Sequence, residues 1–175
     1  MGNKLTKISS YTVGSGGVSS FQFDITSGAW DYLVLYLSLR TNAGTDYSLP
    51  YIRFNNDSTA AAYGQSFFYG LSGGTVGGGF DSDTGALIRY QAGSGSNSNV
   101  FGGGVMYIND VSGSRFKSYF VDSTSPFSGS STTGFMGSAS GQWKNTSAIT
   151  SITISGAGST ILQHSQASLY GMKVG

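Results

Sequence analysis

The sequence predicts an all-β protein, an antiparallel β-sandwich of the jelly-roll type, and three observations support this prediction. The 175 residues include 28 Gly, 31 Ser and 15 Thr but no Glu, and this composition disfavours helices, because Gly costs about 1 kcal/mol per helical residue and Ser and Thr compete for backbone hydrogen bonds. Apolar residues recur at every second position, which is the period of a strand. Turn-forming clusters of Gly, Asn, Ser and Asp separate these runs. A closed barrel is the alternative.

Taken in chain order, the first strand is predicted at residues 5–13 and the second at residues 18–26, where Phe21 and Phe23 alternate with polar residues. The third, at residues 31–41, has the clearest pattern. Its leucines share one face and should point into a core: Leu33, Leu35, Leu37 and Leu39. The same reasoning places further strands at residues 50–55, 85–91, 100–109, 115–121, 133–139, 148–155 and 167–174.

Domain organisation is simple, because no shift in composition divides the chain. We expect one jelly-roll β-sandwich domain at residues 18–175, preceded by an N-terminal arm or first strand at residues 1–17. The Gly-rich run at residues 70–79 is interpreted as a long surface loop. The three glycines at residues 102–104 lie within a predicted strand and indicate a bulge or the close approach of another backbone or subunit.

Charge and hydropathy narrow the classes of function. Aromatic residues make up 14% of the chain and the net charge is +1, so the chain should fold rather than stay disordered. Charged residues make up only 10%, which disfavours nucleic acid as a partner, because phosphate binding needs clustered Lys and Arg. The longest apolar-leaning stretch, residues 32–39, is far shorter than the roughly 20 residues that cross a bilayer. We expect no membrane partner.

Catalytic residues are scarce in this sequence. His164 is the only histidine and there is no cysteine, so a metal site built from several histidines or thiolates is excluded. Serine hydrolases of one large class place their nucleophile in a Gly-x-Ser-x-Gly elbow between a strand and a helix, and no such element is found. His164 is interpreted as a strand-end residue. We expect neither an enzyme nor a cofactor.

Aspartates near turns raise the question of an ion site. Asp81 and Asp83 have the first part of the spacing of a calcium loop, but the Glu that ends an EF-hand loop is missing. Asn55, Asn56 and Asp57 follow a predicted strand and are interpreted as a turn capped by side chains. Turn formation is therefore favoured over metal binding at both places.

Aromatic side chains are the largest source of burial in a chain with few Leu and Ile, since each covers about 150 to 250 Å². Trp30, Trp143 and the eleven tyrosines are expected to fill the core and the contacts between subunits. The alternative is a surface on which sugar rings stack.

Several short motifs together resemble a family. Residues 141–154 read G-Q-W-K-N-T-S-A-I-T-S-I-T-I, and residues 166–172 read Q-A-S-L-Y-G-M. Upstream are F-Q-F-D-I at residues 21–25, alternating leucines followed by Arg40, I-R-F-N-N-D at residues 52–57, and Tyr63. This series, from about Phe21 to Val174, resembles the jelly-roll structural proteins of tailed-bacteriophage virions. Met172 replaces the more usual Ile, and residues 70–79 do not align.

The resemblance implies a non-enzymatic virion protein that assembles as a homotrimer. It implies a capsid decoration (cement) protein, which binds across neighbouring major capsid subunits and stabilises the shell at the capsid surface. The alternative is a tail, fibre or baseplate domain that binds a host receptor or carbohydrate. The N-terminal segment precedes the matched region and contains two of the five lysines, so we expect Lys4, Lys7 and Tyr11 to contact the shell.

Overall fold

The structure, a computed structural model, describes residues 4–26, 28–71, 74–126 and 134–174. These residues form fourteen strands. The bounds are β1 Leu5–Thr12, β2 Ser20–Asp24, β3 Tyr32–Leu39, β4 Tyr47–Ser48, β5 Tyr51–Phe54, β6 Tyr63–Leu71, β7 Gly74–Asp83, β8 Ala86–Leu87, β9 Gln91–Ala92, β10 Gly102–Asn109, β11 Lys117–Ser125, β12 Phe135–Trp143, β13 Ser151–Ser155 and β14 Gln166–Met172.

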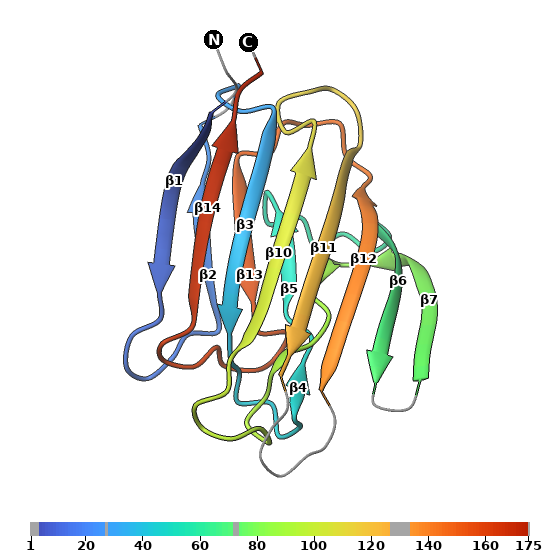
Figure 1. The fold of residues 1–175 in the computed structure, drawn as a ribbon. Helices are drawn as coiled ribbons and strands as arrows, with labels where there is room; N and C mark the ends of the chain where they lie inside the picture. The colour runs from blue at the N-terminus through green and yellow to red at the C-terminus, as the bar shows by residue number, and fades with distance from the viewer. Residues whose placement is uncertain (1–3, 27, 72–73, 127–133, 175) are drawn as a thin grey trace.

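Two antiparallel sheets of unequal size make up most of the molecule. The large sheet has eight strands in the order β1-β14-β3-β10-β11-β12-β6-β7, and the smaller one has the order β2-β13-β5-β8. A third pair, β4 with β9, adds two short strands. Figure 1 shows β2, β13 and β5 lying behind the large sheet. The predicted all-β antiparallel sandwich is confirmed, while its jelly-roll type stays a prediction.

The core lies between the two sheets. The leucines of β3 point inward from the large sheet, and each is at most 6% exposed. Alternation of side chains across a strand leaves the residues between them on the opposite, outer face. The smaller sheet contributes the facing apolar residues: Phe21, Phe23, Ile52, Phe54, Ile152 and Ile154.

The N-terminal segment belongs to the large sheet. Strand β1 pairs antiparallel with β14, from Leu5 opposite Met172 to Thr12 opposite Gln166. The register shifts between Lys7 and Ser9, a bulge of the kind that protects edge strands from unwanted pairing. Strand β1 is an edge strand of the large sheet and therefore lies at the margin of the sandwich (Figure 1).

The interpretation of residues 70–79 as a long surface loop is wrong. Strands β6 and β7 form an antiparallel hairpin there, and β7 is the other edge of the large sheet. Glycine permits close packing at this place: a Cβ on Gly78 would lie 2.9 Å from the ring of Phe67, and one on Gly79 would lie 3.1 Å from the carbonyl oxygen of Gln65. Glycine has no side chain to alternate, so the strand leaves no period in the sequence.

The prediction of a single strand at residues 85–91 is also wrong, because two short strands, β8 and β9, form there instead. Strand β8 pairs with β5, and β9 pairs with β4. Between them Tyr90 has φ of 57°, a left-handed conformation that no continuous strand contains. The chain therefore leaves the smaller sheet within this segment.

The glycines at residues 102–104 allow a close approach of backbones, as predicted. A Cβ on Gly102 would lie 2.6 Å from Cα of Gln91 and 2.9 Å from the carbonyl oxygen of Thr124. The register of β10 with β3 and with β11 is continuous through this run, so close approach rather than a bulge accounts for it. None of the described residues belongs to a helix long and apolar enough to cross a membrane.

Candidate assembly surface

Two of the motifs that carry the family resemblance, residues 52–57 and 141–154, meet in one hydrogen-bonded cluster. Asn55 Oδ1 accepts the amides of Thr150 (2.7 Å) and Ser151 (3.1 Å), and its side-chain amide donates to the carbonyl of Ala148 (2.8 Å). Asn55 has φ of 52°, which asparagine tolerates better than most residues. Residues almost a hundred positions apart in the chain are thus joined by one side chain.

Asp57 completes this cluster. Its Oδ2 accepts the indole N–H of Trp143 (2.7 Å), and its Oδ1 accepts the amide of Thr59 (3.0 Å). Burial raises the pKa of Asp57, but the hydrogen bonds from Thr59 and Trp143 outweigh it, so the pKa lies below its usual value. The interpretation of residues 55–57 as a side-chain-capped turn is confirmed, and the role of Asp57 here is structural.

Three cations of the described chain are buried, Arg40, Arg89 and Lys117, and two of them hold loops. Arg40 directly follows β3, and its guanidinium donates to the carbonyls of Ser96 (2.8 Å) and Val100 (3.0 Å). Lys117, at the start of β11, is fully buried and its Nζ donates to the carbonyl of Gly113 (2.7 Å). Burial lowers the pKa of Arg40 and of Lys117. Their charges face backbone carbonyls and serve the fold.

The two tryptophans pack inside the molecule. Trp143 is completely buried, and Trp30 packs against the core. A Cβ on Gly171 would lie 2.3 Å from the ring of Trp30, so the glycine of the last motif makes room for this indole. The expectation that tryptophans fill the core is confirmed, and a sugar-stacking surface built from Trp143 is excluded.

One half of the outer face of the large sheet displays exposed aromatic rings. Four rings from four neighbouring strands form an aromatic ridge on it: Tyr170 of β14, Tyr36 of β3, Tyr107 of β10 and Phe120 of β11. The rings of Tyr36 and Tyr170 meet edge to face with centroids 5.7 Å apart, and those of Tyr107 and Phe120 stack at 6.5 Å. Each pair lies within the range of favourable aromatic contacts.

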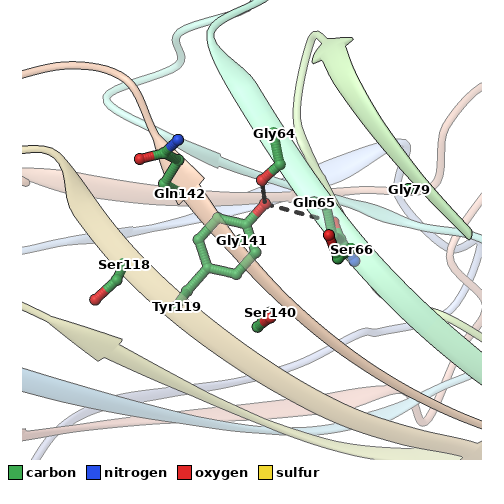
Figure 2. A pocket seen from close by; sticks show the side chains of 9 residues that line it. All are labelled: Gly64, Gln65, Ser66, Gly79, Ser118, Tyr119, Ser140, Gly141 and Gln142. Carbon is green, nitrogen blue, oxygen red and sulfur yellow. Dashed lines mark hydrogen bonds between the residues drawn. The ribbon is translucent and has the colours of Figure 1, made fainter.

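Beside the ridge the same face is hollowed. A trough of about 740 Å³ lies over β11, β12, β6 and β7, and its floor is made of small or polar residues: Gly64, Ser66, Gly79, Ser118, Ser140 and Gln142. Figure 2 shows these residues around the backbone of the four strands. Beneath them Tyr119 points inward, with its hydroxyl 3.3 Å from the carbonyl of Gly64, and burial raises its pKa. The trough therefore exists because the strands present no large side chains there.

One cross-strand row contains both features. The register places Tyr170 opposite Val34, Val34 opposite Tyr107 and Tyr107 opposite Phe120. The row continues from Phe120 to Ser140 and then to Ser66. Along one line across the sheet, bulky rings on one half give way to hydroxyls on the other half.

Little charge lies on this face. On the outer face of the ridge and trough strands, Asp122 of β11 is the carboxylate among the described residues, and it accepts the hydroxyl of Ser138. Asp83, at the end of β7, pairs with the inward-facing Tyr63, and Lys7 of the edge strand β1 is exposed. At the rim two ion pairs neutralise four charges: Arg115 with Asp110 (3.1 Å) and Lys173 with Asp31 (3.0 Å). A surface of this kind costs little to remove from water.

The residues predicted to contact a shell lie on different sides of β1. Lys4 and Lys7 are exposed, and Lys7 pairs with Tyr170 of the ridge. Tyr11 pairs with the buried Ala167 and stacks on Phe21, with ring centroids 4.5 Å apart and an angle of 14°. The structure therefore groups Lys7 with the outer face and turns Tyr11 toward the core.

The remaining candidate residues show no catalytic grouping in the described part of the chain. His164 lies in the turn before β14, has φ of 70°, and its amide donates to the carbonyl of Val13. No three His, Asp or Glu side chains among the described residues are close enough to hold a metal ion. The side chains of Asp81 and Ser82 lie outside the described part, so the prediction that this segment does not bind calcium stays a prediction.

Comparison with protein-family models, with curated proteins and with solved structures finds no match to this chain. The resemblance to phage virion proteins therefore stays a prediction that rests on the motifs themselves. In the structure, those motifs form hydrogen bonds within the fold. The outer face of the large sheet exposes large side chains that do not pack in the core.

Proposed function

We propose that this protein is a non-enzymatic structural component of a tailed-phage virion, a capsid decoration protein of jelly-roll type that assembles as a homotrimer. The observation that supports this most directly is the outer face of the large sheet, because a contiguous exposed apolar patch usually marks a surface that binds another macromolecule. The motif cluster around Asn55 supports it as well, since the residues behind the resemblance are those that join β5 to β13.

Binding to a shell would act by mass action. A protein that binds across neighbouring major capsid subunits binds only the assembled state, so it stabilises that state. Three linked copies make the binding multivalent and raise its avidity without any new contact. We place the shell contact at the start of β1, where Lys4 and Lys7 are exposed, while Tyr11 anchors the strand by stacking on Phe21.

The shell contact is tested with the double variant Lys4→Ala/Lys7→Ala. Co-sedimentation with particles that lack the protein should show occupancy reduced about tenfold, because exposed charges at an interface steer and strengthen association. The melting temperature should stay unchanged, since both lysines are exposed. Substitutions are preferable to deletion, because residues 5–7 pair with β14.

The matched control is Lys173→Ala, which removes an exposed lysine beside Asp31 after the end of β14. Its occupancy on particles should equal that of the unmodified protein. Unchanged occupancy of the double variant would exclude β1 as the shell contact.

A tail, fibre or baseplate domain that binds a host receptor or carbohydrate is the second candidate. The ridge favours it, because Phe120 lies opposite Ser140, whose side chain lines the trough, and sugars are bound by aromatic faces combined with polar groups. Such a domain would occur in few copies per particle. Copy number therefore separates the two candidates.

A further inference from the structure

We propose that the outer face of the large sheet binds a second copy of this chain, with the aromatic ridge of one copy seated in the trough of the other. This inference deepens the self-association included in the proposed function, and it does not depend on binding to a particle. It assigns the contact to named residues: Tyr36, Tyr107, Phe120 and Tyr170 on one side, and Ser66 and Ser140 on the other.

Shape is the first argument. The ridge lies over β14, β3, β10 and β11, and the trough lies over β11, β12, β6 and β7. At the usual strand spacing of about 4.8 Å, each feature is roughly 10 to 15 Å wide. Projection and recess lie side by side on one surface (Figure 2 shows the recess). Side chains from two sheet faces pack by interdigitating, and hydroxyl-bearing and glycine positions leave the space that rings need.

Area is the second argument. Six large side chains on this face are between 38% and 59% exposed: Tyr32, Tyr36, Phe68, Tyr107, Phe120 and Met136. At about 150 to 250 Å² for each aromatic residue, they expose roughly 500 Å² together. A standard interface buries about 800 Å² per partner, of which somewhat more than half is apolar. The exposed apolar area thus matches what a stable pair of copies needs.

Symmetry is the third argument. A half-turn about an axis parallel to the strands lays two such faces together and brings each ridge over the trough of its partner, which is an isologous contact. A ridge-in-trough contact used in one direction, from each copy to the next, closes into a ring of three where the rotation between copies is one third of a turn. The near absence of charge on the face means that two identical surfaces do not repel each other strongly, with Asp122 already hydrogen-bonded to Ser138.

The proposal is tested by the mass of the protein in solution. A single copy has a mass of 18.2 kDa, and sedimentation equilibrium up to about 100 μM covers the affinities expected for an interface of this area. The ridge variant, Tyr107→Ser/Phe120→Ser, and the trough variant, Ser140→Arg, should each weaken self-association about tenfold or more. All three side chains are exposed, and circular dichroism should confirm that both variants are folded.

Two further measurements sharpen the test. Ser20→Arg is the matched control for the trough variant, because Ser20 is also exposed but lies on β2 of the smaller sheet, and it should associate like the unmodified protein. Mixing the ridge variant with the trough variant should restore association in part, since the intact ridge of one fits the intact trough of the other.

A dimer or a trimer that behaves in this way supports the proposal. A monomeric unmodified protein, a ridge variant that still associates, or a mixture that stays monomeric would each overturn it. Because the measurement uses only the purified chain, its result is independent of whether the protein binds particles.

Discussion

Trp143 and Asp57 show at the scale of single residues how the sequence motifs serve the fold. The indole is fully buried, and its N–H donates to the carboxylate at 2.7 Å. A buried donor that loses its acceptor costs about 1 to 3 kcal/mol. Asp57 also accepts the amide of Thr59, so both of its oxygens are used.

Replacing Asp57 by Asn should destabilise the protein at neutral pH by about 1 to 2 kcal/mol, because an amide offers one acceptor oxygen to two donors. The folded-state pKa of Asp57 lies below its usual value, so the charged carboxylate favours the folded state. Its contribution is complete above about pH 4, the unfolded pKa, and is lost as the pH falls through the folded pKa. Urea unfolding of both proteins at several pH values measures this.

The difference in unfolding free energy between the two proteins should therefore shrink in acid. A difference that stays the same from neutral pH to about pH 3 would contradict the role given to the carboxylate.

At the scale of elements, Asn55 joins the end of β5 to the segment that leads into β13. It makes hydrogen bonds to Ala148, Thr150 and Ser151. These bonds hold the segment before β13 beside the end of β5, where the pairing of the two strands begins. A left-handed residue with three such bonds is rarely replaceable, because both the conformation and the side chain are used.

Asn55→Gly separates these two contributions, since glycine accepts a φ of 52° but makes no side-chain bonds. We expect a loss of about 2 to 3 kcal/mol in the free energy of unfolding. Ala61→Gly is the control: Ala61 is exposed and has φ of 68°, so this change should be neutral or stabilise by up to about 1 kcal/mol. Equal effects at the two positions in chemical denaturation would contradict the assignment.

Strand prediction from sequence succeeded for β3 and failed for β6 and β7. Strand β3 was predicted because its leucines occupy every second position, and they are buried as expected. Strand β7 was missed because Gly77, Gly78 and Gly79 carry no pattern, although glycine is what allows the hairpin to pack against Phe67. The break at Tyr90 depends on a single positive φ, and nothing in the neighbouring residue types indicates it.

The candidate surface could be predicted only in part. In β3 the face opposite the leucines contains Tyr32, Val34 and Tyr36, and large apolar residues on both faces of a strand are a signal that both faces are used. The trough had no such signal, because Ser66 comes from β6 whereas Ser118 and Ser140 come from the much later β11 and β12. Only the register of the sheet brings them together.

At the scale of the whole molecule, one sheet face closes the core and the other displays the ridge and the trough. The hydrogen bonds of Asn55, Asp57, Arg40 and Lys117 are directed inward to the fold. The outer face makes none of these bonds, and we propose that it contacts other molecules. This division of roles is what a part of a symmetric assembly requires.

The most direct test of the proposed role is the copy number of the protein in purified phage particles, measured by quantitative mass spectrometry against the major capsid protein. A decoration protein repeats with the symmetry of the shell, so we predict copies on the order of hundreds per particle. A few to dozens of copies would contradict shell decoration and favour the tail domain, and absence from the particles would contradict a structural role in the virion altogether.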